Sequence, residues 1–473
     1  MLFNSFEFVV FFIVVTTLFY VTPNKYRWIL LLGASCVFYM WFVPKYILIL
    51  FTTIVIDYIA GIYIEKSEDD KRRKKTFLIV SIVSTCLVLF IFKYLVFINQ
   101  NIISLSQYFG FYYPDKALKI ILPIGLSFHT FQSLSYVIEV YRGHQKAEKH
   151  FGIYSLYVMF YPQLVTGPIE RPQNLLRQLH EEKKFQYDNI IKGLRLILFG
   201  MFVKMVIADN LATYIDPIYE DPSKYNSLSI LRGIFFYAFQ IYCDFFGYST
   251  IALGCAKAMG YDITDNFRNP YLSKNIGEFW HRWHISLSTW FRDYVYIPLG
   301  GNRVKLSRWI FNIMVVFVLS GIWHGANWTF LIWGAVHGIL LIIENRLNNV
   351  IKIKEPNNKT LGIFYNIIRV TKTFVLVSFL WMIFRAPNIH SIYDICVSMV
   401  NNIHNGENLT VDYMIYLYLG VFIIIDILLY NTRFDKWCDN LNIVVRWIIY
   451  AILIFMTIVF ANIINYPFIY FQF

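Results

Sequence analysis

Thr76-Phe-Leu-Ile-Val-Ser-Ile-Val-Ser-Thr-Cys-Leu-Val-Leu-Phe-Ile-Phe-Lys-Tyr-Leu-Val-Phe-Ile98 is an apolar run of 23 residues that carries one formal charge, at Lys93. A helix needs about 20 apolar residues to cross the hydrocarbon core of a bilayer. The run therefore predicts a membrane-spanning helix. The polar segment before it, residues 65–75, holds six basic residues, which is typical of a loop between two such helices.

Apolar runs of comparable length recur along the whole chain. They cover residues 6–21, 28–43, 46–62, 118–140, 151–165, 194–208, 231–259, 310–323, 328–343, 363–384, 414–430 and 444–464. Some are short or polar enough to be re-entrant, so we expect about 11 true crossings. The pattern predicts an all-α integral membrane fold.

The composition excludes an ordinary soluble protein. Hydrophobic residues make up 57% and charged residues 15% of the 473 residues, against about 25% charged in globular proteins; the mean hydropathy is +0.50. The net charge of +12 comes from basic residues between apolar runs, which indicates a membrane topology signal rather than nucleic-acid binding. Six cysteines without C-x-x-C spacing favour neither a disulfide framework nor a zinc ribbon.

The basic loop also predicts an orientation. Cytoplasmic loops are enriched in Lys and Arg, and counting back three spans from residues 65–75 places the N-terminus outside. The first residues lack a basic region and a cleavage site, so we expect a retained first span rather than a signal peptide. We predict a single polytopic domain, residues 1–473, in the cytoplasmic (inner) membrane.

One stretch, Asn275–Arg303, is too polar to face lipid. It mixes aromatic residues with Glu278, His281 and His284. As one helix it would place the two histidines on one side and turn Arg282 away. An interfacial amphipathic helix explains the aromatic residues, but a buried functional segment better explains two histidines beside an acidic residue.

A further histidine, His324, lies in Leu319-Ser-Gly-Ile-Trp-His-Gly-Ala-Asn-Trp328, inside an uncharged run. Gly321 and Gly325 permit a close backbone approach or a break in the helix. The alternative is a core histidine hydrogen-bonded to a neighbouring helix. His337 lacks polar neighbours in the sequence, which favours a structural role for it.

Histidine chemistry suggests acyl transfer. A neutral imidazole can take a proton from a hydroxyl and return it to a leaving group. Asn327, a Trp side chain or a second imidazole could donate to the developing oxyanion. A three-histidine metal site of His281, His284 and His324 is the rival hypothesis, but no carboxylate or thiol stands at ligand spacing and we predict no metal.

The stretch Glu278-Phe-Trp-His-Arg-Trp-His-Ile-Ser-Leu-Ser-Thr-Trp-Phe-Arg-Asp-Tyr-Val-Tyr-Ile-Pro-Leu-Gly-Gly-Asn-Arg303 resembles the signature of the membrane-bound O-acyltransferase (MBOAT) family. It is most similar to the bacterial alginate O-acetyltransferase branch. Gly321-Ile-Trp-His-Gly-Ala-Asn-Trp328 is similar to the segment that carries this family's catalytic histidine. Further resemblance runs from Leu122 to Leu340.

The resemblance implies roles for individual residues. His324 corresponds to the catalytic base and His284 to a second, supporting histidine. The remaining candidates for substrate binding or the tunnel are Asp244, Trp283, Trp323, Asn327, His281 and Arg282. For Asp244 the alternative is a helix-packing hydrogen bond. The implied fold is a ring of helices around a central tunnel, with a core at about residues 122–345 and peripheral helices in 1–121 and 346–473.

The implied reaction moves an acetyl group from a cytosolic thioester, acetyl-CoA, toward a polysaccharide outside. The acceptor could be alginate-like, another exopolysaccharide or peptidoglycan, and a partner of the SGNH-hydrolase type would complete the transfer. We expect no permanently bound cofactor and no nucleic-acid partner, whereas membrane lipids are expected partners. Two alternatives remain: D-alanyl transfer to teichoic acid from a carrier-protein thioester, and a non-enzymatic transporter, for which no inverted repeat is evident.

Overall fold

The computed structural model describes residues 1–114, 120, 122–165, 167–350, 356, 358–462 and 466–469. Helices dominate this part of the chain; its only β-pairing is an isolated bridge between Tyr225 and Glu407. The contacts gather in two compact units, Met1–Leu194 with Ala252–Thr264, and Arg195–Ile251 with Asp265–Phe473. The expected single polytopic domain stays a prediction.

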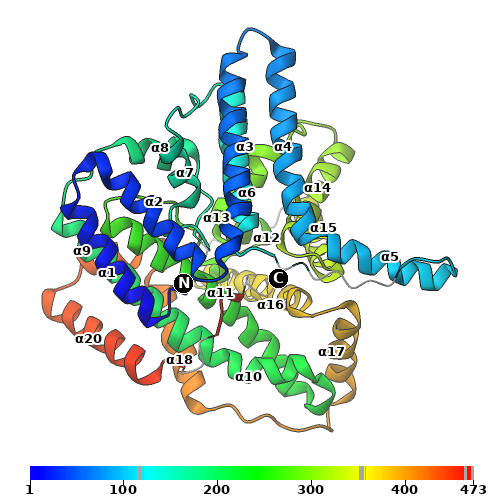
Figure 1. Ribbon diagram of the computed structural model, residues 1–473. Helices are drawn as coiled ribbons and strands as arrows, with labels where there is room; N and C mark the ends of the chain where they lie inside the picture. The colour runs from blue at the N-terminus through cyan, green and yellow to red at the C-terminus, as the bar shows by residue number, and fades with distance from the viewer. Residues whose placement is uncertain are drawn as a thin grey trace. The chain divides into compact units, whose positions relative to one another are not determined.

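The first unit consists mainly of the helices before residue 194 (Figure 1). They are α1 (Phe6–Val21), α2 (Asn24–Met40), η1 (Pro44–Tyr46), α3 (Ile47–Lys66), α4 (Lys71–Lys93), α5 (Leu95–Phe109), α6 (Leu126–Arg142), α7 (Phe151–Met159), α8 (Pro172–His180) and the first half of α9 (Tyr187–Met201).

The second unit holds most of α11 and the helices that follow it. Its elements are the π-helix η2 (Phe202–Ala208), α10 (Asp209–Glu220), η3 (Pro222–Lys224), α11 (Ser227–Ala258), η4 (Pro270–Leu272), α12 (Ile276–Arg282), α13 (Ile285–Phe291), the π-helix η5 (Arg292–Tyr296), α14 (Leu306–His324), α15 (Trp328–Val350), α16 (Lys359–Arg385), α17 (Ile389–Asn401), α18 (Tyr413–Leu428), α19 (Phe434–Asp439) and α20 (Ile443–Phe460).

Several of these helices can cross a membrane. Among the described residues, six are long and apolar enough, and α1 and α18 are shorter apolar helices. Only 6% of the apolar window of α20 and 17% of that of α4 is buried within the protein, so both present apolar side chains outward, as lipid-facing helices do. The chain is a multi-pass membrane protein. The count of 11 crossings is not confirmed, and the runs 118–140 and 444–464 lie partly outside the described residues.

The apolar run 76–98 is not one helix. The chain turns at Tyr94, so that α4 ends at Lys93 and α5 leaves it at a steep angle (Figure 1). Lys93 explains the break, because its ammonium donates to Ser127 Oγ at 3.3 Å instead of lying in an apolar surface. A half-buried polar contact therefore outweighs the helical periodicity.

The α3–α4 hairpin shows how this protein joins helices in an apolar environment (Figure 1). Asp57 of α3 is fully buried and accepts hydrogen bonds from Ser81 Oγ at 2.6 Å and Thr85 Oγ1 at 3.0 Å, both on α4. Hydroxyl groups are common polar contacts between membrane helices. The tip of the hairpin carries the exposed basic loop.

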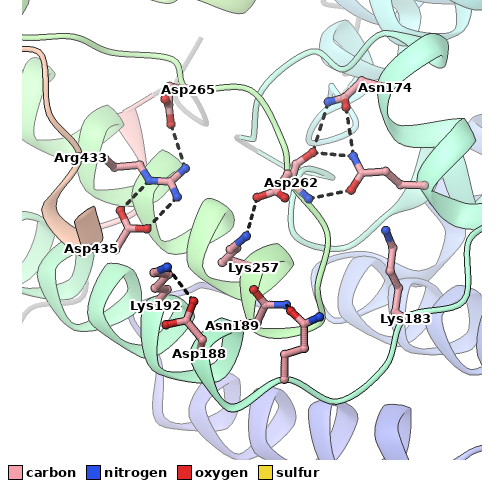
Figure 2. Close-up of polar contacts among 12 residues, drawn as sticks. Asn174, Lys183, Asp188, Asn189, Lys192, Lys257, Asp262, Asp265, Arg433 and Asp435 are labelled. Atoms are coloured by element: carbon pink, nitrogen blue, oxygen red, sulfur yellow. Dashed lines mark hydrogen bonds and ion pairs between the residues drawn. The ribbon is translucent and has the colours of Figure 1, made fainter. Parts of the chain in front are cut away.

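Each unit also contains a polar anchor near residues 257–266 (Figure 2). In the first unit, the backbone N–H of Asp262 donates to Gln178 Oε1 at 2.8 Å, and its carboxylate pairs with Lys257 at 2.9 Å. In the second unit, Arg433 pairs with Asp435 at 2.6 Å and with Asp265 at 3.5 Å. The second anchor fixes Asp265, which directly precedes Asn266.

Helices α14 and α15 pack closely because glycines line their contact. A Cβ added to Gly321 would lie 2.3 Å from the carbonyl oxygen of Phe330, and one on Gly334 would lie 2.3 Å from that of Phe317. No real side chain tolerates such a distance, so these backbones approach as small-residue membrane interfaces do. The prediction that Gly321 allows a close backbone approach is confirmed.

We predict that Gly321→Ala destabilises the protein by about 1–3 kcal/mol, since the added methyl forces the two backbones apart. The measurement is the thermal unfolding midpoint in detergent micelles. Gly420→Ala in α18 is the matched control, because its Cβ would meet no atom within 4 Å; it should unfold at or slightly above the wild-type temperature. An unchanged midpoint for Gly321→Ala would contradict the close packing.

Candidate active site

The site begins with a short helix and a sharp turn. Asn275 caps α12, its Oδ1 accepting from the N–H of Glu278 at 2.7 Å, while Glu278 Oε2 accepts from the N–H of Lys274 at 2.9 Å. After Arg282 the chain is extended at Trp283 and enters a left-handed conformation at His284, with φ 43° and ψ 55°. Helix α13 then starts at once.

Asn266 holds this turn in place. Its backbone carbonyl accepts from the N–H of Ile285 at 3.0 Å, and its Oδ1 accepts from Ser286 Oγ at 2.6 Å. Its amide nitrogen donates to Ser249 Oγ on α11 at 3.2 Å. Asn266 is 1% exposed, so these bonds form away from water. The turn that carries His284 is therefore fastened to α11.

The turn separates the two histidines of the motif. His281 is exposed, and its Nδ1 lies 2.6 Å from the Gly277 carbonyl oxygen within α12. His284 is fully buried. The expectation of one helix with both histidines on one side was wrong, because the left-handed residue ends the helical register after Arg282.

His284 lies among aromatic rings in the second unit. The Phe245 ring centroid is 4.7 Å away and nearly perpendicular, and that of Trp323 is 6.1 Å away. Burial lowers the pKa of His284, in the turn between α12 and α13, to about 3. The ring is therefore neutral at physiological pH and can accept a proton or a hydrogen bond.

His324 is the last residue of α14, which ends where Gly325 becomes extended. It is 3% exposed. Its ring lies 5.0 Å from that of Trp323, 5.1 Å from that of Trp333 and 5.4 Å from that of Phe384. The Trp323 indole thus contacts both His324 and His284, and these two predicted histidines are brought to the same aromatic cluster.

Other predicted residues have local structural contacts. Arg282 pairs with Glu278 at 2.9 Å and donates to Asn431 Oδ1 at 2.7 Å and Tyr430 Oη at 2.9 Å. These contacts fix the end of α12 and engage the guanidinium with Glu278, Asn431 and Tyr430.

Asn327 and Trp283 also have defined contacts. Asn327 donates to the Pro387 carbonyl at 2.6 Å and accepts from the N–H of Thr329 at 3.1 Å, so it caps α15. Trp283 is 1% exposed and its ring lies 4.7 Å from that of Trp381. Both residues therefore shape the surroundings of the site through packing and capping.

Asp244 belongs to a buried ion-pair cluster. Lys204 Nζ lies 2.5 Å from Asp244 Oδ1 and 2.6 Å from Asp209 Oδ1, and the three side chains are 1–4% exposed. Asp244 Oδ2 also accepts from the N–H of Ile469 at 2.8 Å. Lys204 lies in the π-helix η2, where the N–H of Asp209 donates to the carbonyl of Lys204, five residues back. The hydrogen bond considered for Asp244 is thus an ion pair.

A cavity of about 310 Å³ lies beside the turn, between α12–η5 and α14. Its walls include His281, Ile285, Arg292, Tyr296, Phe317 and Ser320. Ser320 precedes His324 by one helical turn, so the cavity reaches the α14 face that leads to this histidine. Its largely apolar lining and its volume fit a ligand with an apolar chain.

Metal-ligand geometry is a separate question. In the part of the chain that the structure covers, no three His, Cys, Asp or Glu side chains gather closely enough to hold a metal ion. Of the rival three-histidine set, His281 is exposed while His284 and His324 are buried.

Sequence reasoning missed four residues that shape the site: Asn266, Lys204, Trp333 and Trp381. Lys204 could have been found, because it is a charge inside the apolar run 194–208. The others carry no signal in the sequence, since their role follows from contacts with residues far along the chain.

Comparison with known proteins gives consistent results. The sequence model of the membrane-bound O-acyltransferase family matches residues 150–386, which include both histidines. The probable alginate O-acetylase of Pseudomonas aeruginosa is 37% identical over 376 residues, 79% of this chain and 69% of the relative. The peptidoglycan O-acetyltransferase of Helicobacter pylori is 32% identical over 401 residues, 79% and 73% of the two chains. The teichoic acid D-alanyltransferase of Bacillus subtilis is 30% identical over 282 residues, 56% of this chain and 69% of the relative.

The ion-pair cluster generates a stability prediction. Lys204→Met should destabilise the protein by about 3–5 kcal/mol, because it leaves two buried carboxylates unpaired. Adding Asp209→Asn and Asp244→Asn should restore most of the loss. Thermal unfolding in detergent is the measurement, and Lys224→Met, which breaks an exposed pair with Asp221, is the control that should change little. Equal stability of Lys204→Met and wild type would disprove the cluster.

The buried His284 generates a pH prediction. Its folded pKa of about 3 lies below the ordinary value of 6.5, so between these values the unfolded state binds more protons and stability falls as the pH falls. His284→Gln removes this contribution. The thermal unfolding midpoint should therefore fall less between pH 8 and pH 5 in His284→Gln than in wild type. An equal fall in both proteins would argue against a buried neutral ring.

Proposed function

Because this chain belongs to the membrane-bound O-acyltransferase family, in its alginate O-acetyltransferase-like branch, we propose that it moves an acetyl group from acetyl-CoA in the cytosol across the membrane for O-acetylation of a polysaccharide outside the cytoplasm. The observation that carries the proposal is the pair of buried imidazoles, His284 and His324, which contact one indole, Trp323. Both lie within the matched family region.

The chemistry assigned to His324 is general base catalysis. Its imidazole takes the proton of the acceptor hydroxyl while the hydroxyl oxygen attacks the thioester carbon. The new C–O bond forms, the C–S bond breaks, and the proton passes from the imidazolium to the leaving thiolate. No net proton is produced, so the histidine is ready for the next transfer.

His284 serves as the supporting group. Its fixed left-handed backbone and full burial give the ring one orientation, and a neutral imidazole can polarise or orient the thioester. The apolar cavity beside α14 is where we place the pantetheine arm of the donor, since Ser320 in its wall lies one helical turn before His324.

The relatives support the proposed class of acceptor, and the basic loop supports the proposed topology. The two relatives that match 79% of this chain are named for acetylation of alginate and of peptidoglycan. We propose an acceptor of this extracytoplasmic class. An SGNH-hydrolase-type partner completes the transfer. The exposed basic tip between α3 and α4 faces the cytoplasm of the inner membrane and the N-terminus lies outside.

We predict that proteoliposomes with the wild-type protein turn over labelled acetyl-CoA, and that His324→Ala and His284→Ala lower the rate by about 10²–10⁴-fold. His390→Ala is the matched control, because His390 is exposed on α17. All variants must first elute as folded protein in detergent.

The contrary outcomes point to different readings. Full activity of His324→Ala would refute the base assignment. Use of a D-alanyl carrier-protein thioester instead of acetyl-CoA would place the chain with the teichoic acid enzymes. Absence of thioester turnover from every donor, with the neighbouring gene products added, would favour a transporter.

A further inference from the structure

Three nitrogen atoms in the aromatic cluster around Trp333, which packs on His324, are buried and have no hydrogen-bond partner within the described residues. They are Trp333 Nε1, Trp381 Nε1 and His337 Nε2. All three side chains are 0% exposed. Buried polar groups in proteins almost always find a partner, and one left alone needs an explanation.

All three nitrogens are hydrogen-bond donors. An indole Nε1 can only donate. His337 could do either, but its Nδ1 already receives a hydrogen bond from Trp280 Nε1 at 3.3 Å. In the neutral ring Nε2 must then carry the hydrogen. The contact with Trp280 therefore makes His337 a third donor.

Trp333 links the three donor side chains to His324. The Trp333 ring lies 5.1 Å from that of His324, 4.9 Å from that of His337 and 5.6 Å from that of Trp381. Trp333 and His337 come from α15 and Trp381 from α16. The residues that pack around them include the phenyl rings of Phe279 and Phe384, which carry no lone-pair acceptor.

A cluster of donors alone selects the chemistry of its ligand. It repels cations and favours an oxygen or sulfur atom that accepts hydrogen bonds, most strongly one that carries negative charge. A water molecule fits poorly, because its own two hydrogens would find no acceptor among these groups. The carbonyl oxygen of a thioester only accepts hydrogen bonds, and it becomes an oxyanion when the hydroxyl attacks the carbonyl carbon.

We propose that Trp333, Trp381 and His337 donate hydrogen bonds to the carbonyl oxygen of the acyl donor and stabilise the oxyanion that forms on it. The inference rests on the proposed function and names the hydrogen-bond donors that bind the carbonyl oxygen in it. As the hydroxyl oxygen bonds to the carbonyl carbon, the π electrons move onto this oxygen; they return when the C–S bond breaks. His324 handles the proton throughout.

Asn327, one of the oxyanion donors considered from the sequence beside Trp side chains and a second imidazole, is used differently. Its amide donates to the Pro387 carbonyl and its oxygen accepts from the N–H of Thr329. These bonds cap α15 and brace the loop before it. The indole N–H groups of Trp333 and Trp381 and Nε2 of His337 instead have no partner among the described residues.

The first test removes one N–H at a time while keeping an aromatic ring. Trp333→Phe, Trp381→Phe and His337→Phe should each lower kcat for acetyl-CoA by about 10²–10³-fold and raise KM by no more than about tenfold, as expected when a bond strengthens in the transition state. Trp290→Phe is the matched control: Trp290 is also buried, at 6% exposure, and its ring contacts Phe291 and Tyr294. It should keep wild-type kcat.

The second test measures binding without turnover. Acetonyl-CoA carries an unreactive ketone one methylene beyond the sulfur, and S-propyl-CoA has the same chain length without the oxygen. Wild type should bind the ketone about tenfold more tightly than the propyl compound. The ratio should fall toward one in Trp333→Phe and Trp381→Phe and stay at the wild-type value in Trp290→Phe.

The outcomes separate this inference from the function it rests on. Wild-type turnover of acetyl-CoA with unchanged kcat and unchanged binding ratio in all three Phe variants would overturn the donor assignment and leave the function intact. Failure of the wild type itself to use acetyl-CoA or to bind acetonyl-CoA would overturn the proposed donor. A similar kcat loss in Trp290→Phe would show that ring size, not the N–H, is responsible, and would also overturn the assignment.

Discussion

The hydrogen bonds between Asn266 and the residues that follow His284 hold the backbone in a left-handed conformation, which costs an L-residue about 1–2 kcal/mol. The rest of the site depends on this turn. It ends α12 after Arg282, turns His284 inward to Phe245 and Trp323, and leaves His281 at the surface. Asn266 is itself placed by its neighbour Asp265, which pairs with Arg433.

The apolar runs predicted the membrane fold because burying a polar backbone in lipid leaves helices as the solution. The glycines around His324 likewise predicted a close approach, and Gly321 provides it. The prediction of one helix over Asn275–Arg303 was wrong, since hydrophobic periodicity does not reveal a single residue in a left-handed conformation. The partners of Asp244 could not be predicted either, because Lys204 reaches it across 40 residues of sequence.

Polar groups in this apolar interior are treated in two ways. Lys204, Asp209 and Asp244 neutralise one another, which lets charges remain buried. The indoles of Trp333 and Trp381 have no such partner among the described residues. A paired cluster fixes helices, whereas a group of lone donors is preorganised for a ligand. The two clusters therefore divide structural and chemical work within one unit.

The π-helical turn at Phe202–Ala208 makes this part of the chain sensitive to length. Its hydrogen bond closes over five residues rather than four, so it accommodates one residue more than an α-helical turn would. Loss of that residue would restore a regular helix and rotate everything beyond it by about 100°. A deletion that a surface loop would tolerate would here swing Asp209 away from Lys204. We therefore expect this segment to tolerate exchanges of side chains better than insertions or deletions.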